Sequence, residues 1–108
     1  MRIGIVGGLD RAVRELEEVA QAAGHELGTH TGVVAGKATA TSLRALVVWS
    51  DLVFVLTDIN SHNAVRMARQ TARLYHRPLR ILRRLGPKHL AAYLRTSVPT
   101  QIPQAAAA

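Results

Sequence analysis

The sequence predicts a parallel α/β sandwich, in which helices cover both faces of one mostly parallel four-stranded sheet. Short apolar runs alternate along the chain with segments of helical spacing, the order of elements found in α/β proteins. The run from Leu52 to Leu56, LVFVL, is apolar throughout, as expected for a strand buried on both faces of a parallel sheet. Right-handed crossovers between such strands place helices on both sides of the sheet.

The start of the chain predicts a strand, a tight turn and a helix. Residues 2–6 form a short apolar run that ends in Gly7 and Gly8. Asp10 is expected to cap the following helix, in which apolar residues recur at helical spacing. Gly24 is expected to end that helix.

The next segments predict a strand, a loop and a short helix. Residues 25–32 alternate in part between polar and apolar, which indicates a second strand that ends near His30. Residues 32–41 are small and predict a loop. Residues 42–50 predict a short helix, although LVVW within them also suits a strand.

A strongly two-sided helix is predicted directly after LVFVL and the polar segment that follows it. Its apolar stripe is Ala64, Met67, Ala68, Thr71 and Leu74. Its basic stripe is Arg66, Arg69, Arg73 and Arg77. Pro78 is expected to end this helix. Residues 79–82 predict a fourth strand, and a last helix is expected over about residues 88–95.

Length and composition predict the number of domains and the cellular location of the protein. The 108 residues predict one domain over residues 1–95 and an extended or disordered tail over residues 96–108. With no cysteine, no membrane-spanning apolar run and no signal-peptide pattern, we expect a soluble cytoplasmic protein without thiolate metal sites. The open edges of a four-stranded sheet predict a homodimer.

The charge is large and unevenly distributed. The chain has 14 Lys and Arg against 7 Asp and Glu, a formal net charge of +7. Most acidic residues lie in the first quarter, whereas basic residues crowd the second half. This asymmetry predicts either a small anionic ligand or nucleic acid as partner, or a solvated basic face that favours solubility.

Ligands of open α/β sheets bind outside the carboxyl ends of the strands, where the strand order reverses. Three segments are expected to meet there: residues 7–10, 30–32 and 57–63. Asn60 or Ser61 is expected to cap the following helix. Asp58 is a candidate to orient an imidazole, and Asn63 a candidate ligand contact.

His62 is the strongest candidate ligand residue. In the first turn of a helix, the positive end of the helix dipole disfavours imidazolium, so we expect a neutral ring with a lone pair for a metal or haem iron. His62 shares a helix face with Arg66, Arg69 and Arg73, at offsets of four, seven and eleven. His30, at the end of the neighbouring strand, is the second candidate.

The residues around these candidates resemble a known family. The stretches GIVGG, HTG, and DLVFVLTD followed by SHNA and a basic helix are similar to bacterial proteins of domain of unknown function 2325, over roughly residues 2–84. The resemblance implies a small Rossmann-like three-layer sandwich, with Gly7 and Gly8 in the first turn. It also implies haem binding, with His30 and His62 as recurring histidines.

We therefore expect a non-hydrolytic ligand-binding module that holds haem or a metal through His62 or His30, with arginines pairing with its anionic groups. An alternative is a nucleotide or phosphate sensor that uses the Gly7–Gly8 turn. Another is non-specific nucleic-acid binding through the basic helix, without an aromatic platform or a recognition motif. No nucleophile elbow, P-loop or acid–base pair predicts an enzyme.

Overall fold

The computed structural model of the chain describes residues 1–8, 13–58 and 60–96. These residues form one sheet of four strands: β1 (Arg2–Val6), β2 (Glu26–His30), β3 (Leu52–Leu56) and β4 (Leu79–Leu82). All neighbouring strands are parallel, and their order is β2-β1-β3-β4. The predicted α/β class with a parallel four-stranded sheet is therefore confirmed.

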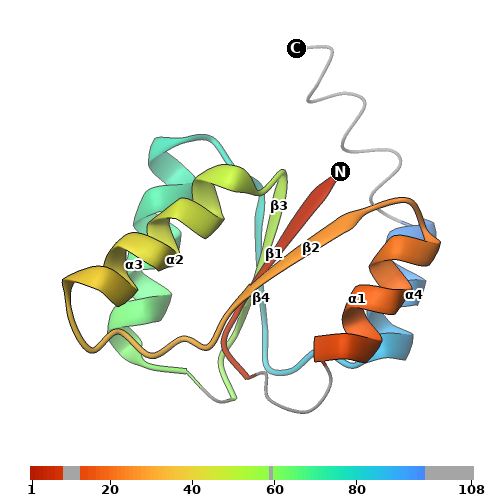
Figure 1. Ribbon diagram of the computed structural model, residues 1–108, viewed down its shortest axis with the longest axis horizontal. Helices are drawn as coiled ribbons and strands as arrows, with labels where there is room; N and C mark the ends of the chain where they lie inside the picture. The colour runs from red at the N-terminus through yellow and green to blue at the C-terminus, as the bar shows by residue number, and fades with distance from the viewer. Residues whose placement is uncertain (9–12, 59, 97–108) are drawn as a thin grey trace.

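Within the described ranges, four helices cover the sheet in two pairs. They are α1 (Val13–Ala22), α2 (Lys37–Trp49), α3 (His62–Leu74) and α4 (Pro87–Thr96). α1 and α4 lie on one face of the sheet, and α2 and α3 lie on the other (Figure 1). Right-handed crossovers impose the faces of α1, α2 and α3, because the chain runs from β1 to β2 in one direction and then from β2 to β3 and β4 in the other. α4 follows the last strand and packs beside α1.

The strand β3 joins the two halves of the core because every one of its residues is buried. Phe54 points to the α1/α4 side, where its ring meets Tyr93 edge-to-face at a centroid distance of 5.1 Å. Val53 and Val55 point to the other side and pack with α2 and α3. The unbroken apolar run thus has the two-sided burial that the sequence predicts.

Two expectations on the α2/α3 side were wrong. Residues 37–41 are helical, so α2 begins five residues before the predicted start at Ser42. The Thr39 hydroxyl accepts hydrogen bonds from the N–H groups of Ala35 and Gly36, at 2.9 and 3.1 Å, and these contacts stabilise the early start. Leu74, the last residue of the predicted apolar stripe of α3, does not join the core: it is 70% exposed and lines the space between α3 and α2.

Arg77 also departs from its predicted place on the basic stripe. It lies beyond the end of α3, and its guanidinium turns back toward α2. Nε and Nη2 donate to the carbonyl oxygen of Val48, at 3.1 and 2.8 Å. Arg77 therefore satisfies a carbonyl in the last turn of α2, and does not belong to the row of exposed arginines.

The remaining boundaries agree closely with the pattern of the sequence. α1 ends before Gly24, which has a φ of +83°, and α3 ends before Pro78. The expected cap Asp10 and the expected tail lie outside the described residues, apart from Thr96 in α4. No helix within the described ranges is long and apolar enough to cross a membrane.

Candidate anion-binding site

The carboxyl ends of β1, β2 and β3 meet at one edge of the sheet. Gly7 N–H donates to the carbonyl oxygen of His30 at 2.8 Å, which joins the ends of β1 and β2. Ser61 Oγ donates to the carbonyl oxygen of Gly32 at 3.0 Å, which joins the start of α3 to the loop after β2. The described parts of the three predicted segments therefore meet at this edge, whereas residues 9, 10 and 59 lie outside the described residues.

Asn60 fills the point where the strand order reverses, between β1 and β3. Its Nδ2 donates to the carbonyl oxygens of Val6 and Leu56, at 3.2 and 2.8 Å. A Cβ added to Gly7 or Gly32 would stand 2.4 Å from the Asn60 side chain. Both glycines also have positive φ, of +100° and +86°. They are thus needed for backbone conformation and for close approach of Asn60.

The sequence predicts either Asn60 or Ser61 as the cap of α3, and the cap is Ser61. Ser61 Oγ accepts a 3.0 Å hydrogen bond from the N–H of Ala64, while Asn60 Oδ1 accepts one from the N–H of Ser61. One signal could have identified the role of Asn60. An amide that follows a buried strand by a few residues can bond two strand-end carbonyls at once.

Both ring nitrogens of His30 are engaged with the backbone. Gly32 N–H donates to Nδ1 at 3.0 Å, and Nε2 lies 3.1 Å from the carbonyl oxygen of Thr39. Because an amide N–H can only donate, Nδ1 is the acceptor and Nε2 carries the proton. A metal at His30 would therefore require one of these hydrogen bonds to break.

The other predicted residues near this edge have separate surroundings. The Asp58 carboxylate lies 3.5 Å from the guanidinium of Arg84, beyond β4. Asn63 is exposed in the first turn of α3, and Gly8 packs beside Leu56 with a φ of +64°. The contacts of Asp58 thus point to the β4 side of the sheet edge.

The flank of α3 carries a hollow of about 410 Å³. Its lining residues are His62, Val65, Arg66, Arg69, Gln70 and Arg73. The predicted ligand histidine and the three predicted arginines thus line one hollow, whereas Gly7, Gly8, Asp58, Ser61, Asn63 and His30 do not line it. The hollow follows from the helical period, because residues three and four apart share one side of α3.

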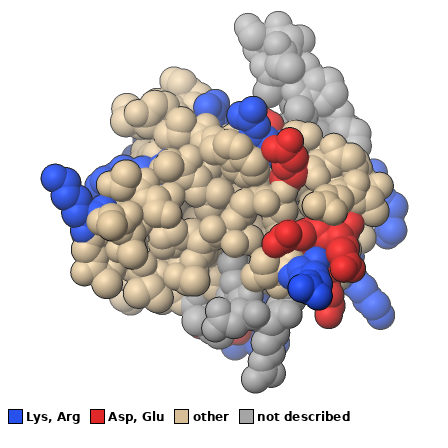
Figure 2. Space-filling view, viewed as in Figure 1, with Lys and Arg blue, Asp and Glu red and all other residues tan. Residues whose placement is uncertain are grey.

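The layer formed by α2 and α3 carries basic residues but no acidic ones. Neither helix contains an Asp or a Glu, whereas α1 contains three Glu. Figure 2 shows the same separation, with blue but no red atoms over the left of the view, where α2 and α3 lie. Among the described residues, Arg66, Arg69 and Arg73 have no carboxylate partner. Their field therefore favours an anion.

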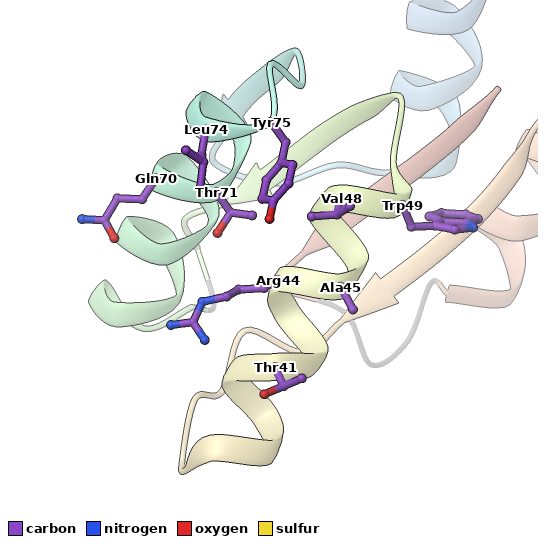
Figure 3. Close-up of a pocket in the computed structure, with 9 residues that line it drawn as sticks. All are labelled: Thr41, Arg44, Ala45, Val48, Trp49, Gln70, Thr71, Leu74 and Tyr75. Carbon is purple, nitrogen blue, oxygen red and sulfur yellow. The ribbon is translucent and has the colours of Figure 1, made fainter.

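A second hollow, of about 650 Å³, lies between α2 and α3 (Figure 3). Tyr75 points into the space between the helices, while Gln70 projects from the outer side of α3. Gln70 lines both hollows, so the two are neighbours on the exposed surface of α3. Arg44, from α2, supplies a cation on this second side.

No group of three or more His, Cys, Asp or Glu side chains comes together around a metal-sized space in the described ranges.

Comparison with known proteins places the chain by family and by fold. A model of a family described as uncharacterized proteins conserved in bacteria, DUF2325, matches residues 2–96. A de novo designed Rossmann fold protein matches with a TM-score of 0.52 and 18% identity, over 88% of this chain and 95% of the design. None of the curated proteins compared matches. The designed protein bears on the fold alone.

Proposed function

Because the chain belongs to the DUF2325 family of bacterial proteins, whose description assigns no activity, we propose a function from the site itself. The protein is a non-hydrolytic ligand-binding module that holds an anionic ligand in the α3 hollow, the depression lined by His62, Arg66, Arg69 and Arg73. The observation that carries the proposal is the presence in a single depression of one exposed imidazole and three guanidinium groups that have no carboxylate partner among the described residues. Guanidinium groups bind carboxylates and phosphates through forked hydrogen bonds.

Haem is the first candidate ligand, as the family resemblance suggests. Haem brings four nitrogen ligands of its own, so one protein histidine is sufficient to hold the iron. His62 is exposed at the start of α3, while His30 already uses both ring nitrogens. Arg66, Arg69 and Arg73 suit the two propionates. The α3 hollow thus offers partners for the iron and the propionates of haem. Val65 is the aliphatic residue in its lining that the porphyrin ring could contact.

Absorption spectroscopy tests this proposal. The full chain is titrated with haemin, and the Soret band is followed for the wild type, His62→Ala and His30→Ala. We expect a saturable band with the wild type and with His30→Ala, and a weakened or shifted band with His62→Ala. The absence of a saturable band with the wild type rejects haem, and equal bands in all three proteins reject His62 as its ligand.

A phosphate-containing ligand is the second candidate, and it would use the same arginines. The Gly7–Gly8 turn is a poorer phosphate site than the sequence suggests, because Gly7 N–H already donates to His30 and Asn60 fills the neighbouring gap. A thermal-shift comparison with pyrophosphate and ATP tests this candidate, since a ligand that binds the native state raises Tm. No rise at millimolar ligand rejects it.

The proposal includes a homodimer. The outer strands of the sheet are β2 and β4, and Ile81 on β4 is 45% exposed. An outer strand with an exposed aliphatic residue can pair with the same strand of a second copy. Light scattering on a size-exclusion column gives the mass directly, and a mass of 11.7 kDa at high micromolar concentration rejects the dimer.

A further inference from the structure

We propose that α3 inserts into the major groove of double-helical DNA, with the α2/α3 layer as the contact face. The inference rests on the proposed function, since it requires the arginines of α3 to hold an anion. It goes beyond that function by naming the anion as the phosphate backbone of a duplex and by assigning base contacts to the ridge of α3.

The first observation is the composition of the α3 ridge, which we define as the exposed residues of α3 before Leu74. These residues are His62, Asn63, Arg66, Arg69, Gln70 and Arg73. Every one can donate hydrogen bonds, and none is acidic or aliphatic. Arg pairs in a forked geometry with guanine O6 and N7, and Asn or Gln pairs with adenine N6 and N7 in the major groove.

The second observation is the shape of the surface around the α3 ridge. One hollow lies between α3 and α2, and the other lies among the side chains of α3 itself, where it is lined by every residue of the α3 ridge except Asn63. A helix with side chains is about 10–12 Å across, and the major groove is about 12 Å wide. The two phosphate strands that border the groove would then lie on either side of α3, near Arg44 of α2 on one side and Arg69 of α3 on the other.

The third observation is the extent of the basic surface. Lys37 and Arg44 on α2 are exposed beside the arginines of α3, and neither helix carries an acidic residue. The thirteen residues of α3 span about 20 Å, at about 1.5 Å of rise per residue. A basic surface of this length suits a regular polyanion. Among duplexes, DNA is favoured because the major groove of RNA is too deep and narrow for a helix.

Fluorescence anisotropy with a labelled 30-base-pair duplex tests the inference on the full chain. We expect a Kd in the micromolar range in about 50 mM salt. The logarithm of the binding constant should fall with the logarithm of the salt concentration with a slope of about −4, which corresponds to about four neutralised phosphates at about −0.9 each. The triple variant Arg66→Ala/Arg69→Ala/Arg73→Ala should bind at least about 30-fold more weakly, because it removes three cations from the contact face.

The matched control removes the same charge from the other face of the sheet. Arg14→Ala/Lys88→Ala/Arg95→Ala changes three exposed residues of α1 and α4. We expect duplex binding within about threefold of the wild type, apart from the long-range effect of net charge. Equal losses in the two triple variants would overturn the inference, as would binding of duplex RNA as tight as that of duplex DNA. Circular dichroism checks that both variants fold.

Dimethyl sulfate protection then identifies the groove. The reagent methylates guanine N7 in the major groove and adenine N3 in the minor groove, so the two positions report separately. We expect protection at N7 alone, and protection at N3 alone would overturn the inference. If haemin or pyrophosphate binds the α3 hollow and the duplex does not, this inference fails while the proposed function stands. If neither small anion nor duplex binds, both fail.

Discussion

Ser61 and Gly32 are joined by a 3.0 Å hydrogen bond, in which the Ser61 hydroxyl donates to the Gly32 carbonyl oxygen. The same hydroxyl accepts a hydrogen bond from the N–H of Ala64, at 3.0 Å. One oxygen thus caps α3 and fastens the loop after β2 to the start of that helix. Since α3 carries the candidate site, this contact sets the position of His62 and the arginines relative to the sheet.

Replacement of Ser61 should destabilise the protein. Ser61→Ala removes the cap and the bond to Gly32, for which we expect a loss of about 1–2 kcal/mol in the free energy of unfolding. Urea denaturation followed by circular dichroism measures it. The control Ser42→Ala changes an exposed serine within α2 and should stay within about 0.5 kcal/mol of the wild type. Similar values for the two variants would contradict the role of Ser61.

A second prediction follows from the lack of space between Gly32 and the Asn60 side chain. Gly32→Ala should be more destabilising than Gly24→Ala, although the two glycines have nearly equal φ, of +86° and +83°. A Cβ at Gly32 would stand 2.4 Å from Asn60 Oδ1, whereas nothing lies within 4 Å of one at Gly24. We expect a difference of at least about 1 kcal/mol in unfolding free energy.

A double variant separates the steric cause from the conformational one. Asn60→Ala removes the group that a Cβ at Gly32 would meet, so Gly32→Ala should be less destabilising in that background than in the wild type. Strict additivity of the two substitutions in urea denaturation would show that the close approach of Asn60 has no effect.

Arg77 and Arg73 should respond differently to replacement. Arg77→Ala removes both hydrogen bonds to the Val48 carbonyl and should lower the free energy of unfolding by about 1–2 kcal/mol. Arg73→Ala changes an exposed residue and should stay within about 0.5 kcal/mol. In ligand binding, Arg73→Ala should have the larger effect of the two, because Arg73 lines the α3 hollow. Thermal denaturation and ligand titration of both variants measure the two effects, and the same order in both experiments would contradict the assignment.

The pKa of His25 makes the stability of the protein depend on pH. Burial, and secondly the positive amino terminus, lower the pKa of His25 below its ordinary value of 6.5. The unfolded chain therefore binds a proton at a higher pH than the folded chain does. The stabilisation is fully present above about pH 6.5 and is lost as the pH falls through the lowered pKa.

Urea denaturation at pH 7.5 and pH 5.0 measures this dependence. His25→Gln should reduce the difference in stability between the two pH values, because it removes the group that must be protonated. His89→Gln, which replaces an exposed histidine of α4, is the control and should leave the difference unchanged. An unchanged difference in His25→Gln would exclude His25 as its source.

The fold was largely predictable because its signals are local. The run at residues 52–56 has no polar residue, and Gly24 and Pro78 end helices for reasons of backbone geometry. The start of α2 was missed, because it depends on the Thr39 hydroxyl bonding residues three and four positions before it. The spacing of apolar residues does not reveal that contact.

The candidate site was predictable only where helical spacing defines it. His62, Arg66, Arg69 and Arg73 share a flank because of the period of α3, and the hollow contains all four. The roles of Asn60, His30 and Arg77 depend on backbone carbonyls and amides that are distant in the sequence or in another element. A residue pattern does not show which backbone group a side chain will meet.

The most direct measurement of the central claim is an NMR titration of the ¹⁵N-labelled chain with pyrophosphate. The account predicts saturable shifts of amide resonances concentrated in residues 62–73, lost in Arg66→Ala/Arg69→Ala/Arg73→Ala and retained in Arg14→Ala/Lys88→Ala/Arg95→Ala. Shifts centred instead on Arg80, Arg83 and Arg84, or shifts that persist in the α3 variant, would contradict it.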